Sequence, residues 1–452
     1  MIKRICHFDS NLEDSIFLFG ARQTGKSTFL RQTFPDNIYI DLLDTAIKGR
    51  FRRHPALLYE MLSDTEKGTL AIIDEIPEVP ELLNEVHRLM SEKDIVFILC
   101  GSSTRKLKRK GYNTLGGRAY PMYLFPFVSA EIPDFNLQQA VNYGMLPPHY
   151  LAKNPHRRLT AYIEVYLKEE IKEEALVRNL NSFQRFLEVA ALTDGEIVNY
   201  NNIAQDCGVS ANTVGNYFDI LEDTLLGFRI PAYTKTKKRK LMQAPRFYYF
   251  DVGIANHLLH RQELIRGTAE YGHAFEHLVI QELKAWLSYK ESTEQLSYWR
   301  AYTGQEVDAV IGDARVAIEI KSVEEVLPRH LKGLKTFASD YPESKQIIVS
   351  LDPINRKIGN VECIYILDFF KSGLLTLVAA AFMAVGVNAQ PEDVIKVSSG
   401  NPDWGQMYVN DGCSISIVFS EVQLANAIRS TIFTFLFRYT DSRCLQLAKA
   451  LS

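Results

Sequence analysis

The chain has 452 residues, of which 46% are hydrophobic and 23% charged, and its formal net charge is −3. This is the composition of a soluble globular protein with room for roughly three domains of ~150 residues. The six cysteines are scattered without a C-x-x-C pair, which argues against a zinc site or a disulfide framework, and no stretch reaches the roughly 18–20 apolar residues of a membrane span. The N-terminus shows no signal peptide, so we expect a cytoplasmic protein. The near-balanced net charge argues neither for nor against a nucleic-acid partner.

The first functional motif is a phosphate-binding loop. Gly20 to Ser27 read G-A-R-Q-T-G-K-S, directly after the apolar run 16–19 and before a helical stretch. A strand, a glycine-flanked turn and a helix N-terminus in this order cradle phosphates with backbone amides. Lys26 is expected to reach the β- and γ-phosphates, and the Ser27 hydroxyl to hold Mg²⁺. The residues expected to bind ATP are Gly20, Ala21, Arg22, Gln23, Thr24, Gly25, Lys26, Ser27, Thr28 and Ser102.

A second motif ends a buried strand in two carboxylates. Residues 70–73 are apolar and lead into Asp74 and Glu75. Ligands of parallel sheets bind at the carboxyl ends of the strands. We expect Asp74 to act on Mg²⁺ and Glu75 to polarise the attacking water.

Three further strands complete an expected parallel sheet, at 37–41, 95–99 and 119–127. The strand 95–99 leads into Ser102 and Ser103, either of which could sense the γ-phosphate. Arg118 precedes the last strand and is a candidate charge-stabilising arginine; the alternative is a structural or solvated arginine.

The following segment is helical and includes an expected amphipathic helix over 157–178. Residues 203–210 and 213–218 then suggest a helix-turn-helix, with Gly208 at the turn and Ser210 as the cap of the second helix. The basic run Lys235–Lys240 follows, which suggests a winged helix that could contact DNA. The alternative is a winged helix used only for packing.

A second group of acids lies near residues 306–321. If Gly312 and Asp313 form a tight turn, Glu306 lies opposite Glu319 with Asp308 diagonal to it. By alternation, Glu306, Asp308, Glu319 and Lys321 then share one face, and Val307, Ile311, Val316, Ile318 and Ile320 share the other. Converging carboxylates repel unless a cation lies among them, so this face could bind Mg²⁺.

An upstream helix adds Glu276, which its apolar neighbours Phe275, Leu278, Val279 and Leu283 would turn toward the sheet. Glu276, Asp308, Glu319 and Lys321 together form the pattern of a PD-(D/E)xK nuclease. Glu276, Asp308 and Glu319 are the expected metal ligands, and Asp308, Glu319 and Lys321 the expected catalytic groups. The alternative is a charged, solvent-exposed hairpin face with Glu–Lys pairs, and cleavage is a separate question from fold.

With these motifs, the chain resembles a prokaryotic family of ATPases that join an AAA-like ATP-binding domain to a C-terminal DUF4143 domain. The resemblance runs from near residue 3 to about 371. It rests on 20–28, 73–77, 101–103, 117–118, 245–253, 272–276, 298–300, 306–308 and 319–321. It implies ATP binding, hydrolysis through Asp74 and Glu75, and a nuclease-like C-terminal fold. The family supplies no substrate, and Ala232 stands where a second proline is expected.

The tail from residue 374 does not fit this pattern. Residues 374–387 are apolar and rich in small residues, like an internal signal sequence, and are too short for a membrane span. A fused or frameshifted segment would explain the tail; a buried helix extending the last domain is the alternative.

We therefore expect an α/β P-loop ATPase domain (1–135), a helical and winged-helix segment (136–240), an α+β nuclease-like domain (241–373) and the atypical tail (374–452). In the main hypothesis, ATP and Mg²⁺ control how the C-terminal domain engages DNA. The rival treats that domain as a non-catalytic module for a protein partner. A third reading is ATP binding with negligible turnover. Homo-oligomerisation is compatible with each of them.

Overall fold

The computed structural model describes residues 2–8, 12–103, 115–167, 180–234 and 244–373, together with three strands within 394–418. The chain divides into two units, Met1–Ala381 and Phe382–Ser452. Within the described residues, no helix has the length and apolar character needed to cross a membrane.

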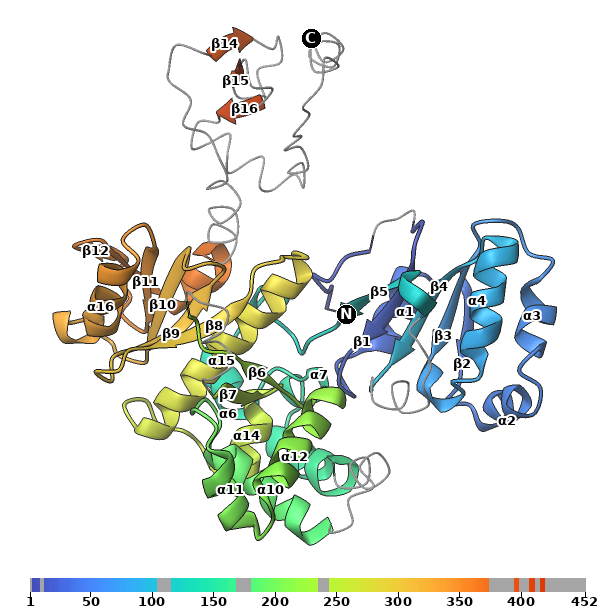
Figure 1. Cartoon of the computed structure of the whole chain (residues 1–452), viewed down its shortest axis with the longest axis horizontal. Helices are drawn as coiled ribbons and strands as arrows, with labels where there is room; N and C mark the ends of the chain where they lie inside the picture. Colours follow the sequence, from blue (N-terminus) through green and yellow to red (C-terminus); the bar gives the residue numbers. More distant parts are fainter. Residues whose placement is uncertain are drawn as a thin grey trace. The chain divides into compact units, whose positions relative to one another are not determined.

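The N-terminal part of the first unit is built on a five-stranded parallel sheet in the order β2-β3-β4-β1-β5 (Figure 1). The strands expected at 16–19, 37–41, 70–74 and 95–99 are all present. The elements are β1 (Ser15–Phe19), α1 (Lys26–Thr33), β2 (Ile38–Asp41), α2 (Thr45–Arg53), α3 (Leu57–Leu62), β3 (Leu70–Asp74), the 3₁₀ turn Ile76–Glu78, α4 (Leu82–Lys93), β4 (Val96–Gly101), the 3₁₀ turn Leu115–Gly117 and β5 (Ala119–Tyr123).

The last of these strands is shorter than expected, because β5 ends at Tyr123 and does not continue to Phe127. The amide of Phe125 donates to the Tyr289 hydroxyl at 3.0 Å, and the amide of Phe127 donates to the Met145 carbonyl at 2.9 Å. Pro126 between them has no amide hydrogen to donate. The backbone therefore leaves the sheet at this point and joins the rest of the unit.

Both faces of the parallel sheet are covered, as its continuous apolar strands require. Phe29 and Leu30 of α1 pack against one face, in a buried cluster with Ile16 and Ile98. Helices α2, α3 and α4 cover the other face, where Val86 and Leu89 contact the side of the sheet that carries Phe97. This arrangement places the carboxyl ends of β1, β3 and β4 at one edge.

A helical segment follows, in which the turn predicted at Gly208 and the cap predicted at Ser210 are both observed. Gly208 has φ +65°, and the Ser210 hydroxyl accepts from the Thr213 amide. The basic run 235–240 and residues 168–179 lie outside the described residues. The elements are the 3₁₀ turn Ser129–Glu131, α6 (Leu137–Tyr143), α7 (Pro147–Tyr150), α8 (Pro155–Ala161), the π-helix Tyr162–Leu167, α10 (Leu180–Leu192), α11 (Tyr200–Cys207), α12 (Ala211–Asp223), β6 (Gly227–Ile230) and β7 (Arg246–Tyr249), the last two paired antiparallel.

The C-terminal part of the first unit is a mixed six-stranded sheet in the order β12-β13-β11-β10-β9-β8. Helix α15 covers one face through a cluster that includes Phe275, Leu278, Val279 and Leu283, as expected, and α16 covers the other. The elements are α14 (Val252–Leu258), α15 (Ala269–Tyr289), β8 (Leu296–Arg300), β9 (Glu306–Ile311), β10 (Val316–Lys321), the 3₁₀ turn Pro328–Leu331, α16 (Lys332–Asp340), β11 (Lys345–Ser350), β12 (Arg356–Ile358), β13 (Val361–Tyr365), α17 (Ile366–Asp368) and the π-helix Phe369–Gly373.

The second unit contains three described strands, which pair antiparallel in the order β14-β15-β16. They are β14 (Val394–Val397), β15 (Gln406–Asn410) and β16 (Ile415–Val418). The rest of the predicted atypical tail lies outside the described residues.

Candidate functional site

The phosphate-binding loop connects β1 to α1, and its backbone requires glycine at both ends. A Cβ atom on Gly20 would lie 2.5 Å from the Leu124 carbonyl oxygen. Gly25 has φ +90°, a conformation that L-residues rarely adopt. The loop therefore curls where the predicted pattern places it.

The N-terminus of α1 faces this loop without a side-chain cap and without an acidic residue in its first turn. Such a helix end offers amide donors and a partial positive charge to an anion. Lys26 is buried, and its Nζ atom donates to the carbonyls of Gly20 at 2.6 Å and Ala21 at 3.2 Å. Of the other predicted loop residues, Arg22 and Ser27 are half-buried, whereas Gln23 and Thr28 are exposed.

Asp74 supplies an unsatisfied acceptor at the end of β3. Its Oδ2 atom accepts from the Tyr39 hydroxyl at 2.5 Å, whereas its buried Oδ1 atom has no hydrogen-bond partner within the described residues. A buried carboxylate oxygen without a donor is costly unless a cation or water meets it. Oxygen is the ligand type that Mg²⁺ prefers, so Asp74 and the half-buried Ser27 fit the predicted magnesium site.

Glu75 is held in a strained conformation beside Asp74. Its φ is +56°, in the left-handed region that is unfavourable for a residue with a side chain. Its carboxylate accepts from both the amide and the hydroxyl of Ser102, each at 3.3 Å. The two predicted residues thus meet through side-chain and backbone contacts.

The charges of this site surround the end of β4. Burial raises the pKa of the Cys100 thiol, the Asp74 carboxylate raises it further, and the Lys26 ammonium lowers it. Arg118 is not part of this group, because its exposed guanidinium donates to the Ser91 hydroxyl of α4. A role for Arg118 in catalysis stays a prediction.

Arg4 joins the phosphate-binding loop to the C-terminal part of the unit. Its guanidinium donates to the Thr24 carbonyl at 2.7 Å, to the Glu131 carboxylate at 3.0 Å and to the Tyr289 hydroxyl at 3.3 Å. Its side chain is only 5% exposed. Tyr289 is the last residue of α15, so the buried Arg4 guanidinium contacts both the phosphate-binding loop and this helix. No sequence pattern had pointed to Arg4, which has no motif around it.

The predicted register of the acidic hairpin is wrong by two residues. Val316, Ala317 and Ile318 pair with Ile311, Val310 and Ala309, which leaves a four-residue loop, 312–315, between the strands. If this pairing is extended by one residue along each strand, Glu319 lies opposite Asp308 and not opposite Glu306. The loop is longer than the predicted two-residue turn for two reasons. Ala314, like Gly312, adopts a positive φ, here 57°, and Asp313 accepts a hydrogen bond from the Tyr233 hydroxyl at 2.6 Å.

The predicted face of Val307 is also wrong. Val307 packs with Val310 and Ala317 on the α16 side of the sheet, whereas Ile311, Val316, Ile318 and Ile320 pack on the α15 side as expected. Strand β9 pairs irregularly with β8 between Ser297 and Trp299, and such a bulge breaks strict alternation.

The predicted acids do converge, and two cations lie among them. Arg246 contacts the carboxylates of Glu276 at 3.1 Å and Asp308 at 3.7 Å, and it also pairs with Glu306. Lys321 contacts Glu319 at 2.7 Å and Asp308 at 3.3 Å. The role of Arg246 was missed because it lies on β7, far in sequence from these acids. Arg246 does lie within the resemblance motif 245–253, but nothing in that motif assigned it a carboxylate partner.

Burial also raises the proton affinity of two of these acids. It raises the pKa of Glu276 to about 7 and that of Glu319 to about 8, and the neighbouring Asp308 carboxylate adds to both shifts. Among the described residues, no three acidic, histidine or cysteine side chains are arranged to hold a metal ion. In this arrangement the positive charge comes from Arg246 and Lys321.

Comparison with known proteins places three families along the chain. Residues 13–132 match an AAA domain, residues 134–264 a domain of unknown function (DUF8612), and residues 271–369 a second such domain (DUF4143). An uncharacterized protein of Haemophilus influenzae is 22% identical over 246 residues. That match covers 50% of this chain and 60% of the relative, so the chain spans less than two thirds of the relative's length.

Solved structures with some similarity include a Walker-type ATPase of Pyrococcus abyssi, with 15% identity and a TM-score of 0.37 over 55% of this chain and 93% of that one. The ADP form of the Aeropyrum pernix ORC2 protein has 13% identity and a TM-score of 0.30 over 55% and 88%. The parallel sheet and its phosphate-binding loop form an ATPase domain of P-loop type. The chain therefore carries an AAA domain followed, after the DUF8612 match, by a DUF4143 domain.

Proposed function

We propose that the protein binds ATP with Mg²⁺ and hydrolyses it at the edge formed by the phosphate-binding loop, β3 and β4. The proposal rests above all on Glu75, whose strained backbone and Ser102 contacts fix a carboxylate one residue after Asp74, the residue whose buried Oδ1 has no hydrogen-bond partner within the described residues. Strain of this kind persists where the surrounding structure enforces it, and it concentrates at functional positions.

The residues divide the chemistry between them. The amides of the loop and of the first turn of α1 bind phosphate oxygens. Lys26 gives up its hydrogen bonds to the loop carbonyls and contacts the phosphates instead. Ser27 and Asp74 would hold Mg²⁺, which neutralises charge on the phosphates when bound. Glu75 orients a water and accepts its proton, and Ser102 fixes the Glu75 carboxylate and responds to the γ-phosphate.

A pair of variants tests this proposal. Glu75→Gln should bind ATP normally and release phosphate at least about 100-fold more slowly, since general-base catalysis contributes at least that factor. Lys26→Ala should lose ATP binding in calorimetry. Glu60→Gln, on the exposed side of α3, is the matched control and should behave as the wild type. ATP binding by Lys26→Ala equal to that of the wild type would overturn the proposal.

We further infer that nucleotide state is passed to the C-terminal domain through Arg4 and α15. Arg4 contacts the loop at Thr24 and helix α15 at Tyr289, and the same helix carries Glu276 of the acidic cluster. A movement of the loop on ATP binding would therefore act directly on a helix of that domain.

For the C-terminal domain, one observation favours a binding module over a nuclease. Arg246 and Lys321 already neutralise the carboxylates that a nuclease would offer to Mg²⁺. Incubation with plasmid and Mg²⁺ or Mn²⁺, with and without ATP, separates the two functions. Cleavage that disappears in Asp308→Ala would establish the nuclease; intact plasmid in every arm would support a switch for a protein partner.

DNA contact would depend on the basic run 235–240, which lies outside the described residues. On α12, the exposed side carries Asn212, Asn216 and Asp219. The nearby Arg229 pairs with Asp219 at 2.6 Å and with Glu222, so it is not available to phosphate. A salt-insensitive affinity for DNA, unchanged in Lys237→Glu combined with Lys238→Glu, would exclude this role for the run.

A further inference from the structure

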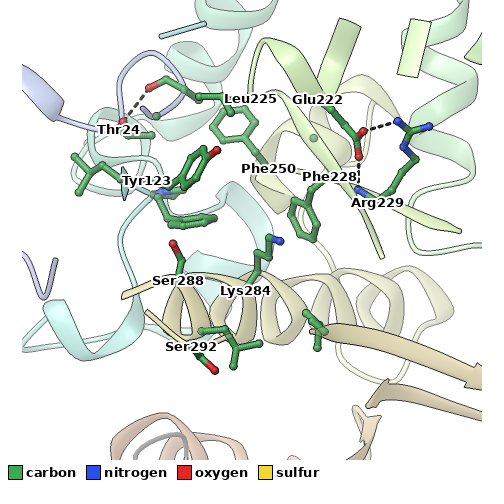
Figure 2. Close-up of a pocket in the computed structure, with 18 of the residues that line it drawn as sticks. Thr24, Tyr123, Glu222, Leu225, Phe228, Arg229, Phe250, Lys284, Ser288 and Ser292 are labelled. Carbon is green, nitrogen blue, oxygen red and sulfur yellow. Dashed lines mark hydrogen bonds and ion pairs between the residues drawn. The ribbon is translucent and has the colours of Figure 1, made fainter. Parts of the chain in front are cut away.

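A cavity of about 500 Å³ adjoins the phosphate-binding loop. Gly20, Ala21 and Thr24 of the loop line it on one side. The rest is lined by residues from the end of β5 and the segment after it, from α12 and β6, from Phe250, and from α15 and the segment that leads into β8 (Figure 2). This volume lies within the range of pockets that hold a small organic molecule. The phosphate-binding loop and the C-terminal domain thus share one cavity.

The wall of the cavity is mainly aromatic and apolar. Tyr123, Phe228 and Phe250 line it, and Figure 2 shows the Lys284 side chain leaving α15 toward Phe228. Flat rings of this kind pack well against a planar ligand. Ser288 and Ser292 add hydroxyl groups on the α15 side.

Lys284 differs from the other charged groups of the cavity wall. Arg229 pairs with Glu222, and Glu294 pairs with Arg315 at 2.9 Å. Within the described parts of the chain, Lys284 has no carboxylate partner within 4.0 Å, and its Nζ atom lies 5.8 Å from the centre of the Phe228 ring. Burial lowers the pKa of Lys284, although the Glu222 carboxylate opposes that shift. A half-buried ammonium without a carboxylate partner leaves its donors available to a ligand.

We propose that the nucleoside half of the nucleotide occupies this cavity and that Lys284, a residue of the C-terminal domain, donates a hydrogen bond to an acceptor nitrogen of its purine base. This inference rests on the proposed ATP-binding function. The loop residues that line the cavity place it next to the phosphates, the aromatic wall fits a planar base, and the lysine supplies donors that the ring nitrogens accept.

The consequence is direct contact between the nucleotide and the helix that carries the acidic cluster. Glu276, Lys284 and Tyr289 lie on α15, a single helix of 21 residues. Nucleotide binding would then engage α15 at Lys284 in addition to the Arg4 contact at Tyr289. The C-terminal domain would sense the base itself and not only the movement of the loop.

The test compares Lys284→Met with Lys290→Met by calorimetry. Lys290 is a matched control, because its Nζ atom also lies 5.8 Å from an aromatic ring, that of Trp286, but it is exposed and does not line the cavity. Each variant is titrated with ATP and with inorganic tripolyphosphate, both in Mg²⁺. Lys284→Met removes a desolvated charge and is expected to fold; thermal unfolding checks this, and Lys284→Arg, which keeps the charge, is the second variant.

We expect Lys284→Met to weaken ATP binding by at least about tenfold, the effect of losing a hydrogen bond from a charged donor, and to leave tripolyphosphate binding unchanged. Lys290→Met should change neither, and Lys284→Arg should retain most of the ATP affinity. Unchanged ATP affinity in Lys284→Met, or an equal loss for both ligands, would overturn the inference while leaving the proposed function intact. Failure of the proposed function would show differently, as ATP binding that survives Lys26→Ala.

Discussion

Arg4 donates to a carboxylate oxygen of Glu131 at 3.0 Å while it also donates to the Thr24 carbonyl of the phosphate-binding loop at 2.7 Å. Both side chains of this ion pair are buried, the Glu131 side chain completely. The pair is therefore desolvated, and its two charges depend on each other. This dependence makes the contribution of Arg4 measurable.

We predict that Arg4→Met lowers the free energy of unfolding by roughly 3–5 kcal/mol, because it leaves Glu131 charged, buried and unpaired. Arg4→Met combined with Glu131→Gln should recover a large part of that loss. Urea unfolding of the two variants and of Glu131→Gln completes a double-mutant cycle. Additive effects would show that the pair contributes no coupling energy.

A second prediction concerns Asp74 and its Tyr39 contact. Asp74→Asn should bind ATP without metal as the wild type does, but should require at least about tenfold more Mg²⁺ for half-maximal hydrolysis, since an amide is a weaker ligand for a hard cation than a carboxylate. Tyr39→Phe removes only the hydroxyl that donates to Oδ2 and keeps the charge, so its Mg²⁺ requirement should change much less. An equal change in both variants would mean that Tyr39 acts on the metal site as strongly as the carboxylate itself.

The arrangement of the proposed nucleotide site was largely predictable because its residues are local in sequence. The glycines, Lys26 and Ser27 lie within one loop, and Asp74, Glu75 and Ser102 follow apolar runs that could be recognised as strands. Parallel strands bring such ends to one edge, so the contact between Glu75 and Ser102 followed from topology alone. No sequence pattern predicted the strained backbone of Glu75.

The acidic cluster was only partly predictable, since contacts distant in sequence decide its details. The loop length depends on Asp313, which Tyr233 holds across 80 residues, and the composition alone suggested a shorter turn. Arg246 reaches Glu276 and Glu306 over 30 and 60 residues. Converging carboxylates required a cation. The alternative of Glu–Lys pairs offered Lys321 as one such cation, but no sequence pattern indicated Arg246.

A third prediction follows from Arg246. Replacement by methionine should leave Glu276, Glu306 and Asp308 without their guanidinium and lower the melting temperature, because the repulsion among the acids is then uncompensated. Mn²⁺ should restore part of that loss in Arg246→Met and change the wild type much less. The additional variant Arg246→Met with Asp308→Asn should lose the Mn²⁺ effect. Equal thermal shifts in all three proteins would mean that the ion binds elsewhere.

The last prediction uses the pH dependence of Glu282, a buried residue of α15 that accepts from the amide and the hydroxyl of Ser129 at 2.6 and 3.1 Å. Burial raises its pKa to about 8, and the Glu131 carboxylate, itself paired with Arg4, adds to that shift. The folded protein therefore keeps a proton on Glu282 that the unfolded chain releases near pH 4.5. Stability from this proton is fully present below about pH 4.5 and is lost progressively as the pH rises to about 8.

Glu282→Gln cannot lose a proton, so its melting temperature should exceed that of the wild type at pH 8.5, with a difference that shrinks toward pH 5. The exposed residue Glu270 lies on the same helix, and Glu270→Gln should show no such trend. A difference between Glu282→Gln and the wild type that stays constant across this range would show that Glu282 is already ionised in the folded protein at pH 5.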